Sequence, residues 1–312
     1  MQLVDQWNRR IRKLRVSLTD QCNLRCRYCM PLHPEFLDKS SYLTPRQYKE
    51  IIGELLDYGI EEVRITGGEP LVRQDFDEVI QELAKLKIPS LSLTTNGLLL
   101  HRYWDVLKAA NVLNLNVSLD SLQPSTQAAI ARRDCLADIL RNIQEGIARG
   151  FSLKVNTVVM RGINDCELFD FVEFARKTGV TVRFLELMRV GYANSLYEEH
   201  YVSAQECIAR LQERYTLTPL PAAPDSTAFY FTIDENVKVG FIASESQPFC
   251  SSCSRWRLTA DGRLFACLFS EEGLSVRDKT PGQRQQIYQQ LLGMKPLRRV
   301  EQVSHPMYGL GG

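Results

Sequence analysis

The sequence of 312 residues has no long hydrophobic run and almost no net charge. No apolar stretch approaches the roughly 20 residues that a helix needs to cross a bilayer, which excludes a spanning helix. The formal net charge is +1, so no overall field recruits nucleic acid or an anionic membrane. The charged stretch of residues 1–13 is not followed by an apolar segment. We therefore expect no signal peptide and a cytoplasmic location.

Histidine is also scarce, with four residues, whereas cysteine is abundant, with nine. In a reducing compartment cysteines serve more often as metal ligands than in disulfides. Six of them form two groups of three: Cys22, Cys26 and Cys29 (C-x3-C-x2-C), and Cys250, Cys253 and Cys267 (C-x2-C-x13-C). Neither group has an obvious fourth protein ligand, and no histidine lies within residues 219–300 to complete the second.

Three thiolates leave the nature of each site open. Zinc sites usually have four protein ligands, which neither group offers. A 4Fe–4S cluster held by three thiolates keeps one iron free to bind a small molecule. Spacing alone does not separate such a cluster from a zinc knuckle or from three buried thiols.

A strand-then-helix unit recurs along the first two-thirds of the chain. The expected strands are Leu14–Thr19, Glu62–Thr66, Ser90–Thr95, Val112–Leu119, Ser152–Met160 and Thr181–Met188. The expected helices are one from the capping box Thr44–Gln47 to Gly59, and others near Asp75–Lys87, Arg102–Ala110, Leu136–Arg149 and Cys166–Thr178. This alternation predicts a parallel sheet, either doubly wound or curved into a partial barrel.

One face of these strands is polar, which favours the barrel. Residues 113–120, LNLNVSLD, alternate strictly, whereas strands covered by helices on both faces are apolar nearly throughout. We therefore predict a partial (βα)6 TIM-type barrel with a polar interior. Four strands each place a basic residue there: Arg15, Arg64, Lys154 and Arg183. Unless they lie in water at strand ends, these cations predict a polyanionic ligand such as a phosphorylated metabolite.

The pattern of alternating strands and helices ends after the sixth strand. Residues 219–224, PLPAAP, are typical of a linker. We therefore divide the chain into a barrel, residues 1–218, and a C-terminal region, residues 219–312, that contains the second cysteine group. A hairpin with its turn at Asp261–Gly262 is expected in that region.

Three short features add to the candidate site. Gly67–Pro70, GGEP, follows the second strand, where glycines allow close approach to a ligand and Glu69 offers an acceptor to an ammonium group. Arg255 and Arg257 share a strand face near the second cysteine group. The terminal Gly311–Gly312 is either a frayed tail or a segment small enough to enter a crowded site.

The first cysteine group, with Tyr28 before its last cysteine, and the GGEP sequence resemble those of the radical S-adenosylmethionine (SAM) enzymes. Segments over nearly the whole chain resemble the GTP 3′,8-cyclases of that superfamily, among them RITGGEPLVR, LTTNGLLL, NVSLDSL, KVNTVVMRGIND, VRFLELM and FCSSCSRWRLTADGRLFACLF. The resemblance implies a partial barrel and the radical cyclisation of GTP to 3′,8-cyclo-7,8-dihydro-GTP, the first step of molybdenum cofactor biosynthesis.

The resemblance also implies a role for each site residue. The first cysteine group would bind the 4Fe–4S cluster at which SAM is cleaved, and the second would bind another whose open iron contacts guanine. The implied SAM contacts are Tyr28, Gly67, Gly68, Glu69, Ser118 and Met188. The implied GTP contacts are Arg15, Arg64, Thr94, Lys154, Arg183, Arg255, Trp256, Arg257, Gly311 and Gly312. Arg255 and Arg257 are the candidate catalytic residues besides the cysteines of the first group.

The implied partners are a reduced flavodoxin- or ferredoxin-like electron donor, cyclic pyranopterin monophosphate synthase as the next enzyme, and a second copy in a homodimer. We expect neither nucleic acid nor membrane as a partner. Two alternatives stay open: a radical SAM enzyme that modifies peptides or matures another enzyme, and a zinc-stabilised binding protein without chemistry. Two features depart from the family pattern: Trp256 is bulky, and residues 275–305 look short.

Overall fold

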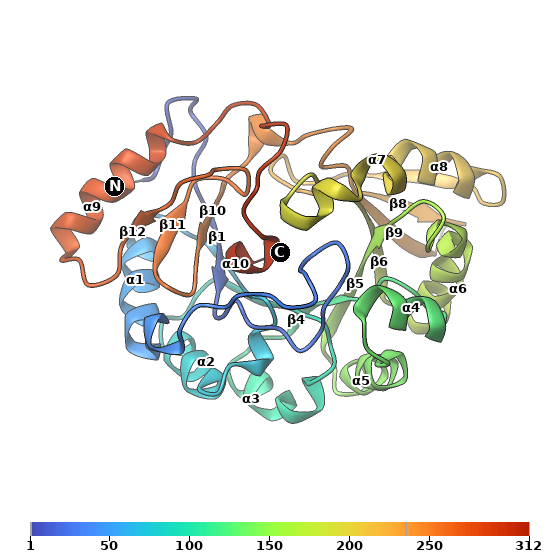
Figure 1. The fold of residues 1–312 in the computed structure, drawn as a ribbon, viewed down its shortest axis with the longest axis horizontal. Coiled ribbons are helices and arrows are strands. Elements are labelled where there is room, and N and C mark those ends of the chain that lie inside the picture. The colour runs from blue at the N-terminus through green and yellow to red at the C-terminus, as the bar shows by residue number, and fades with distance from the viewer. Residues whose placement is uncertain (1, 235, 312) are drawn as a thin grey trace.

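The parallel sheet predicted from the sequence forms the inner wall of the molecule (Figure 1). The computed structural model describes residues 2–234 and 236–311. Six parallel strands follow one another in chain order around the wall. They are β1 (Lys13–Ser17), β2 (Glu62–Thr66), β3 (Ser90–Thr95), β4 (Asn114–Ser118), β5 (Ser152–Val159) and β6 (Thr181–Glu186). All six expected strands are therefore present, with small shifts at their ends.

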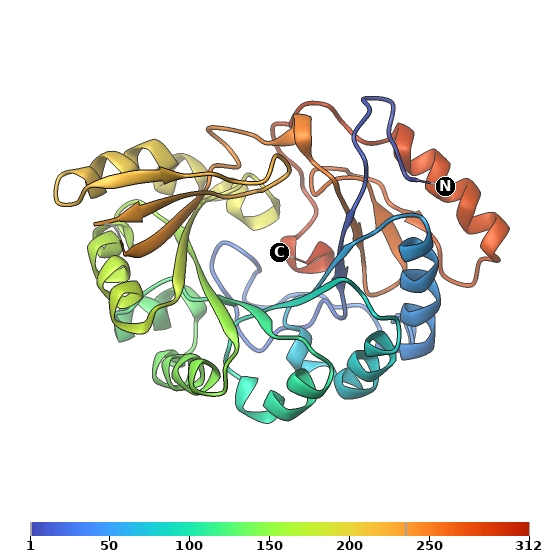
Figure 2. The same ribbon diagram turned by 180° about the vertical axis from the view of Figure 1, so that it is seen from behind.

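Helices cover the outside of this wall, as Figure 1 and the reverse view in Figure 2 both show. They are α1 (Pro45–Asp57), α2 (Phe76–Ala84), α3 (Trp104–Ala109), α4 (Pro124–Ala131), α5 (Leu136–Ala148) and α6 (Leu168–Thr178). The capping box of α1 is confirmed, since the Thr44 side chain accepts from Gln47 N and the Gln47 side chain accepts from Thr44 N. The prediction of a partial (βα)6 barrel is confirmed.

The C-terminal residues extend the same sheet at both edges. Next to β6 lie β9 (Val237–Ile242), β8 (Phe229–Ile233) and β7 (Leu217–Leu220), and next to β1 lie β10 (Arg255–Leu258), β11 (Arg263–Phe265) and β12 (Leu274–Ser275). The stretch expected to be a linker thus begins inside β7, because Pro219 lies opposite Phe231 in an edge strand, where proline is tolerated. The hairpin expected at Asp261–Gly262 is confirmed between β10 and β11.

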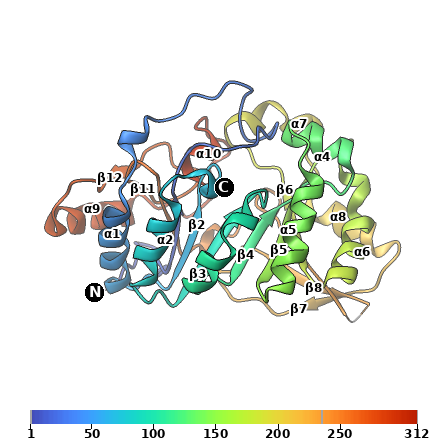
Figure 3. The ribbon, with the colours of Figure 1, turned by 90° about the horizontal axis from the view of Figure 1, so that it is seen from below.

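The remaining helices are α7 (Tyr197–His200), α8 (Ala204–Gln212), α9 (Pro281–Gly293) and α10 (Met307–Leu310). Figure 1 and Figure 2 show α10 inside the ring of strands, although it lies at the end of the chain. Viewed from below, the loop after β1, α7 and α10 lie together at the edge of the barrel where the parallel strands end (Figure 3). This edge holds the binding site in barrels of this type.

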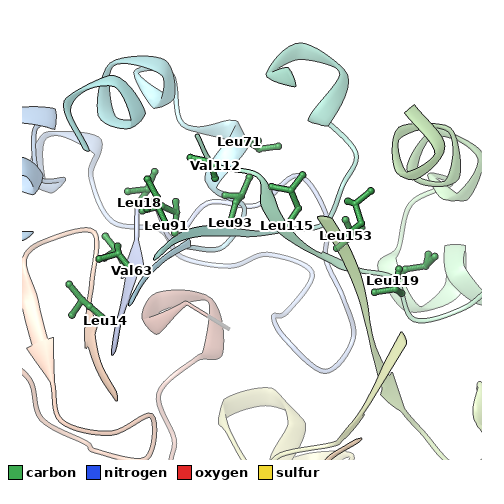
Figure 4. Close-up of a cluster of buried hydrophobic side chains, with 14 of the residues drawn as sticks. Leu14, Leu18, Val63, Leu71, Leu91, Leu93, Val112, Leu115, Leu119 and Leu153 are labelled. Carbon is green, nitrogen blue, oxygen red and sulfur yellow. The ribbon is translucent and has the colours of Figure 1, made fainter. Parts of the chain in front are cut away.

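The core lies between the sheet and the outer helices, as the apolar parity of the strands predicts. Leucine and valine side chains from consecutive strands pack there, among them Leu14, Val63, Leu93, Leu115 and Leu153 (Figure 4). Each is at most 6% exposed, and burying such a side chain contributes about 1.5–3 kcal/mol. The opposite parity faces the interior of the ring. Within the described residues, no helix has the length and apolar character needed to cross a membrane.

Candidate active site

The four basic residues predicted from strand parity line one cavity inside the ring: Arg15, Arg64, Lys154 and Arg183. They come from β1, β2, β5 and β6, and Lys13 from β1 and Arg255 from β10 bring the cations that line the cavity to six. The register of the paired strands explains why these side chains meet, because Arg15 lies directly opposite Arg64 on one side and Arg257 on the other. Strict alternation along each strand then sends these side chains to the same face.

The cations of this cavity are only partly neutralised. Arg64 bonds Glu62 at 2.9 Å and Arg183 donates to Asn156 Oδ1 at 2.8 Å. Arg15 has no ion pair with a carboxylate among the described residues. Burial, followed by repulsion from Arg257 and Arg64, lowers the pKa of Arg15 well below its usual value. The cavity therefore favours a ligand with several negative charges.

Thr94, Ser118 and Met188 lie near the strand ends. Thr94 is on β3 and its hydroxyl is 3.5 Å from the Asn116 amide nitrogen. Ser118 is the last residue of β4 and pairs in register with Asn156. Met188 follows β6 and packs against the small cluster that contains Phe265 and Leu310. Their assignment to GTP or SAM stays a prediction.

The first cysteine group lies in the loop after β1. Its three thiols are half-buried, whereas the lone Cys135 and Cys207 are buried. Cys29 N and Met30 N both bond Cys26 O, at 2.9 and 3.1 Å, which makes a tight turn between Cys26 and Cys29. Leu24 N lies 3.4 Å from Cys22 Sγ.

The chemistry of the first group suits an iron–sulfur cluster. Burial, followed by Cys22 and Asp120, raises the pKa of Cys29 to about 12, so a group that stabilises thiolates has to be supplied from outside the chain. No three His, Cys, Asp or Glu side chains of the described residues gather closely enough for a single metal ion. Three cysteines in one loop fit a 4Fe–4S cluster with one open iron better than a zinc site, which usually has four protein ligands.

Tyr28 is anchored by a residue that the sequence analysis did not single out. Its hydroxyl donates to Asp120 Oδ2 at 2.8 Å, and Asp120 Oδ1 accepts from Val158 N at 2.9 Å. Burial raises the pKa of Asp120 to about 6. Asp120 continues the polar parity of β4 beyond its end, so the strict alternation of residues 113–120 was a usable signal.

Gly67 and Gly68 bring the loop after β2 against the backbone of the cysteine loop. Gly68 N bonds Thr19 O at 2.6 Å, and Glu69 N bonds Gln21 O at 2.8 Å. A Cβ on Gly68 would lie 2.5 Å from the carbonyl oxygens of both Asp20 and Gln21. These glycines thus permit a close approach between two backbone segments. Direct contact of either glycine with SAM stays a prediction.

We expect Gly68→Ala to destabilise the folded protein by about 3 kcal/mol, because neither backbone carbonyl can move away without displacing the cysteine loop. Urea unfolding of the metal-free protein measures this change. Gly293→Ala is the matched control, because its Cβ would meet nothing within 4 Å and alanine favours the helix by about 1 kcal/mol. Equal stability of Gly68→Ala and the wild type would contradict this account of the loop.

Glu69 is almost completely buried and already has three donors. Its Oε1 accepts from Thr95 Oγ1 at 2.8 Å and from Leu71 N at 3.1 Å, and its Oε2 accepts from Asn96 N at 2.6 Å. Burial raises the pKa of Glu69 to about 7 despite these bonds. The carboxylate therefore ties the end of β3 to the loop after β2, and its contact with the SAM ammonium stays a prediction.

The raised pKa of Glu69 predicts a pH dependence of stability. Its folded pKa of about 7 exceeds the ordinary value of 4.5, so the folded chain binds the proton more tightly than the unfolded chain. The free energy of unfolding contributed by this group is therefore largest below about pH 4.5 and falls by about 3 kcal/mol as the pH rises to 7. The free energy of unfolding of the metal-free protein is measured with urea at pH 5 and at pH 7.5. It should change less between these two pH values in Glu69→Gln than in the wild type. The same difference in both proteins would refute this assignment.

The second cysteine group surrounds the start of β10. Its thiols are half-buried, and Phe269 N lies 3.4 Å from Cys267 Sγ. Cys253 has cationic neighbours, since Arg255 Nη2 is 3.7 Å and Lys295 Nζ 3.5 Å from its sulfur. Burial would raise the pKa of Cys253, but Arg255 and Lys295 outweigh burial and lower it to about 6. Cys253 therefore favours the thiolate form more strongly than the cysteines of the first group, whereas burial raises the pKa of Cys250.

Arg257 connects this region to the C-terminal tail. Its Nη1 donates to the carbonyl oxygens of Leu310, at 3.4 Å, and of Gly311. A Cβ on Gly311 would lie 2.4 Å from Thr66 Cγ2 at the end of β2. The tail thus enters the ring of strands, and only glycine fits there. Gly312 lies outside the described residues.

The side chain of Trp256 does not face the cavity. This residue alternates with Arg255 and Arg257, so its side chain points to the opposite face of β10, beside Leu14 of β1. It is 0% exposed and its ring lies 6.2 Å from that of Tyr288 in α9. The predicted contact with GTP is therefore wrong. The bulk of this residue fills the core between the sheet and α9.

Comparisons with known proteins agree with this geometry. The family profile of the Radical SAM superfamily matches residues 16–175, and that of Molybdenum Cofactor Synthesis C matches residues 180–301. A Synechocystis sp. protein named GTP 3′,8-cyclase is 54% identical over 310 residues, which are 99% of this chain and 95% of that protein. The chain belongs to the GTP 3′,8-cyclase family. A GTP 3′,8-cyclase of Aquifex aeolicus is 41% identical over 280 residues, or 88% of each chain.

Each cysteine group of this GTP 3′,8-cyclase family member falls in a different profile, the first in the Radical SAM match and the second in the Molybdenum Cofactor Synthesis C match. The crystal structure of Streptococcus suis SuiB bound to precursor peptide SuiA has a TM-score of 0.67 to this chain at 14% identity. The match covers 88% of this chain and 64% of SuiB. At this identity the likeness shows the fold alone, which is the expected barrel.

Proposed function

We propose that this protein converts GTP to (8S)-3′,8-cyclo-7,8-dihydro-GTP, the first step of molybdenum cofactor biosynthesis, by radical chemistry that SAM initiates. The observation that carries the proposal is the set of six cations from five strands around one cavity, of which Arg255 also contacts Cys253 of the second group. Such a cavity suits a triphosphate. A radical enzyme that acts on peptides is not favoured, because a peptide does not offer this concentration of negative charge.

The reaction joins C3′ of the ribose to C8 of guanine. The bond from C3′ to hydrogen breaks and the hydrogen atom passes to the 5′-deoxyadenosyl group, which leaves as 5′-deoxyadenosine. The product is an isomer of GTP, so N7 of guanine gains a hydrogen as one electron and one proton. A cluster on Cys22, Cys26 and Cys29 would supply, when bound, the electron that cleaves the sulfonium of SAM to methionine.

The residues of the cavity position the substrate. Arg15, Arg64, Lys154 and Arg183 would hold the triphosphate, because their side chains meet from separate strands and Arg15 lacks a carboxylate partner among the described residues. Thr94 lies on the same strand face as the residues that line the cavity. Holding the ribose fixed near SAM raises the effective concentration of the reacting hydrogen. Tyr28, Gly67, Gly68, Glu69, Ser118 and Met188 would form the SAM site at the strand ends.

A second 4Fe–4S cluster on the second cysteine group would bind the guanine edge. Three half-buried thiols with a cation against Cys253 support this assignment. Arg255 and Arg257 would stabilise negative charge on the substrate, and Gly311 and Gly312 would close the site through Arg257. We propose the division into residues 1–218 for SAM cleavage and 219–312 for the second cluster on this basis.

The proposed reaction needs two electrons from outside the chain. We propose a reduced flavodoxin- or ferredoxin-like donor, cyclic pyranopterin monophosphate synthase as the enzyme that takes the product, and a homodimer. All nine cysteines are free thiols, as the proposed cytoplasmic location allows, since its reducing conditions disfavour disulfides. Pull-down with reduced flavodoxin under anaerobic conditions and light scattering test the donor and the dimer.

Anaerobic reconstitution followed by iron and sulfide analysis tests the proposed function. We expect about eight irons per chain, as two 4Fe–4S clusters require. With dithionite and SAM, we expect 5′-deoxyadenosine when GTP is present and little when GTP is replaced by ATP. About four irons would refute the second cluster. Cleavage of SAM that is indifferent to the nucleotide would refute the assignment of the substrate.

A further inference from the structure

The buried side chain of Lys295 lies against the second cysteine group and is neither a proposed cluster ligand nor a proposed substrate contact. It is 2% exposed and follows α9, in the segment that looks short in the sequence. Its Nζ donates to the carbonyl oxygens of Arg255 and Ala266, each at 2.8 Å, and lies 3.5 Å from Cys253 Sγ. An ammonium group has three N–H donors, so each donor of Lys295 has an acceptor.

The charge of this ammonium has no carboxylate partner in the described ranges, 2–234 and 236–311. A buried cation costs several kcal/mol unless an anion compensates it. The sulfur of Cys253 is the nearest group that can carry negative charge, and a cysteine that ligates iron is a thiolate. The charge of Lys295 is therefore compensated when Cys253 ligates a cluster.

The backbone around Lys295 is fixed to the same cysteine group. The buried Arg9 donates to Cys250 O at 2.6 Å, to Pro296 O at 2.9 Å and to Lys295 O at 3.2 Å. Its own charge is paired with Asp5 at 2.7 Å. Arg9 thus holds Lys295 and Cys250 in one rigid arrangement, which fixes the position of the ammonium relative to the cysteines.

The two cysteine groups differ in the donors that face their sulfurs. The described donors to Cys22 are Leu24 N and the Asn96 amide, at 3.4 and 3.9 Å, and both are neutral. Cys253 faces two cations, Lys295 at 3.5 Å and Arg255 at 3.7 Å. Positive charge and hydrogen bonds at ligand sulfur stabilise the reduced form of an iron–sulfur cluster.

We propose that Lys295 is a positioning residue of the second cluster, which holds the sulfur of Cys253 in place through its N–H contact and raises the reduction potential of that cluster through its charge. This inference rests on the proposed function, because it requires the second cluster. A cation beside the ligand also offsets part of the repulsion between an anionic cluster and the triphosphate. Lys295 therefore favours both reduction of the second cluster and binding of GTP next to it.

Redox titration of the reconstituted full-length enzyme, followed by electron paramagnetic resonance, tests this inference. The variants are Lys295→Met, which removes the charge and keeps the volume, and Lys295→Arg, which keeps the charge. Lys279→Met is the matched control, because Lys279 is exposed in the same region. The signal of the first cluster is identified by its response to SAM, and iron per chain is measured for every variant.

At the potential where half of the wild-type second cluster is reduced, we expect about a tenfold lower ratio of reduced to oxidised second cluster in Lys295→Met. This change equals about 59 mV for one electron. The first cluster should be unaffected, and Lys295→Arg and Lys279→Met should stay within threefold of the wild type. Loss of the second cluster from Lys295→Met but not from Lys295→Arg would equally support the role of the charge.

Two results would overturn the inference while leaving the proposed function intact. One is a ratio within threefold of the wild type in Lys295→Met with both clusters present. The other is loss of the second cluster from both Lys295→Met and Lys295→Arg, which would show a packing requirement. About four irons in the wild type would instead refute the second cluster, and with it both the proposed function of residues 219–312 and this inference.

Discussion

Cys26→Ser is expected to abolish the formation of 5′-deoxyadenosine from SAM, with a rate at least about a thousandfold below the wild type. Mutation of a residue that only hydrogen-bonds to a metal ligand already lowers metal affinity or activity 10–100-fold, and Cys26 would be a direct ligand. Its carbonyl also accepts the two backbone bonds that shape the loop, a geometry that serine can keep. The loss should therefore arise from the missing thiolate. Anaerobic assay of 5′-deoxyadenosine by chromatography measures it.

Cys166→Ser is the control for this prediction, because Cys166 is exposed and stands alone in the sequence. We expect full iron content and unchanged 5′-deoxyadenosine formation in this variant. The Cys26→Ser protein should retain about four irons per chain, those of the second cluster. Undiminished cleavage of SAM by Cys26→Ser would show that the first cysteine group does not hold the reactive cluster.

Arg257→Ala is expected to lower the yield of cyclised product by about a hundredfold or more while the iron content stays the same. One donor that stabilises developing charge is typically worth a factor of 10²–10³ in rate. Arg257 is 8% exposed and also holds the carbonyls of Leu310 and Gly311, so its loss would free the tail as well. Arg257→Lys should restore little of the product yield, because one ammonium cannot reproduce the planar arrangement of donors of a guanidinium group.

Arg263→Ala is the matched control, since this arginine is exposed on the partner strand of the same hairpin. We expect its product yield within about threefold of the wild type, as for surface substitutions in general. Liquid chromatography of the quenched reaction, with iron analysis of the same samples, measures both variants. An unchanged yield in Arg257→Ala would remove Arg257 from the catalytic machinery.

Strand parity explains why much of the site could be predicted from the sequence. In a parallel sheet with in-register neighbours, alternation alone decides which side chains face inward, so Arg15 and Arg64 had to meet once β1 and β2 paired. The cysteine spacings are local in sequence and need no tertiary information. The polar interior was therefore visible in the sequence, because its residues obey a period of two.

The remaining features depend on contacts between distant segments. Nothing local to Lys295 indicates that its ammonium reaches Cys253, which is 42 residues away in sequence. Asp120 acts through Tyr28, 92 residues away. Trp256 was assigned to the substrate because its neighbours were, although the same parity rule places it on the other face of β10. Applying that rule to every residue of the strand would have avoided the error.

The most direct test of the central claim follows one hydrogen atom. The reconstituted enzyme is given SAM, dithionite and GTP deuterated at C3′, and the 5′-deoxyadenosine is analysed by mass spectrometry. The account predicts deuterium in 5′-deoxyadenosine and a cyclised product that has lost it from C3′, because the proposed function places the ribose next to the proposed SAM site. Unlabelled 5′-deoxyadenosine formed together with cyclised product would contradict the placement of GTP and the reaction proposed here.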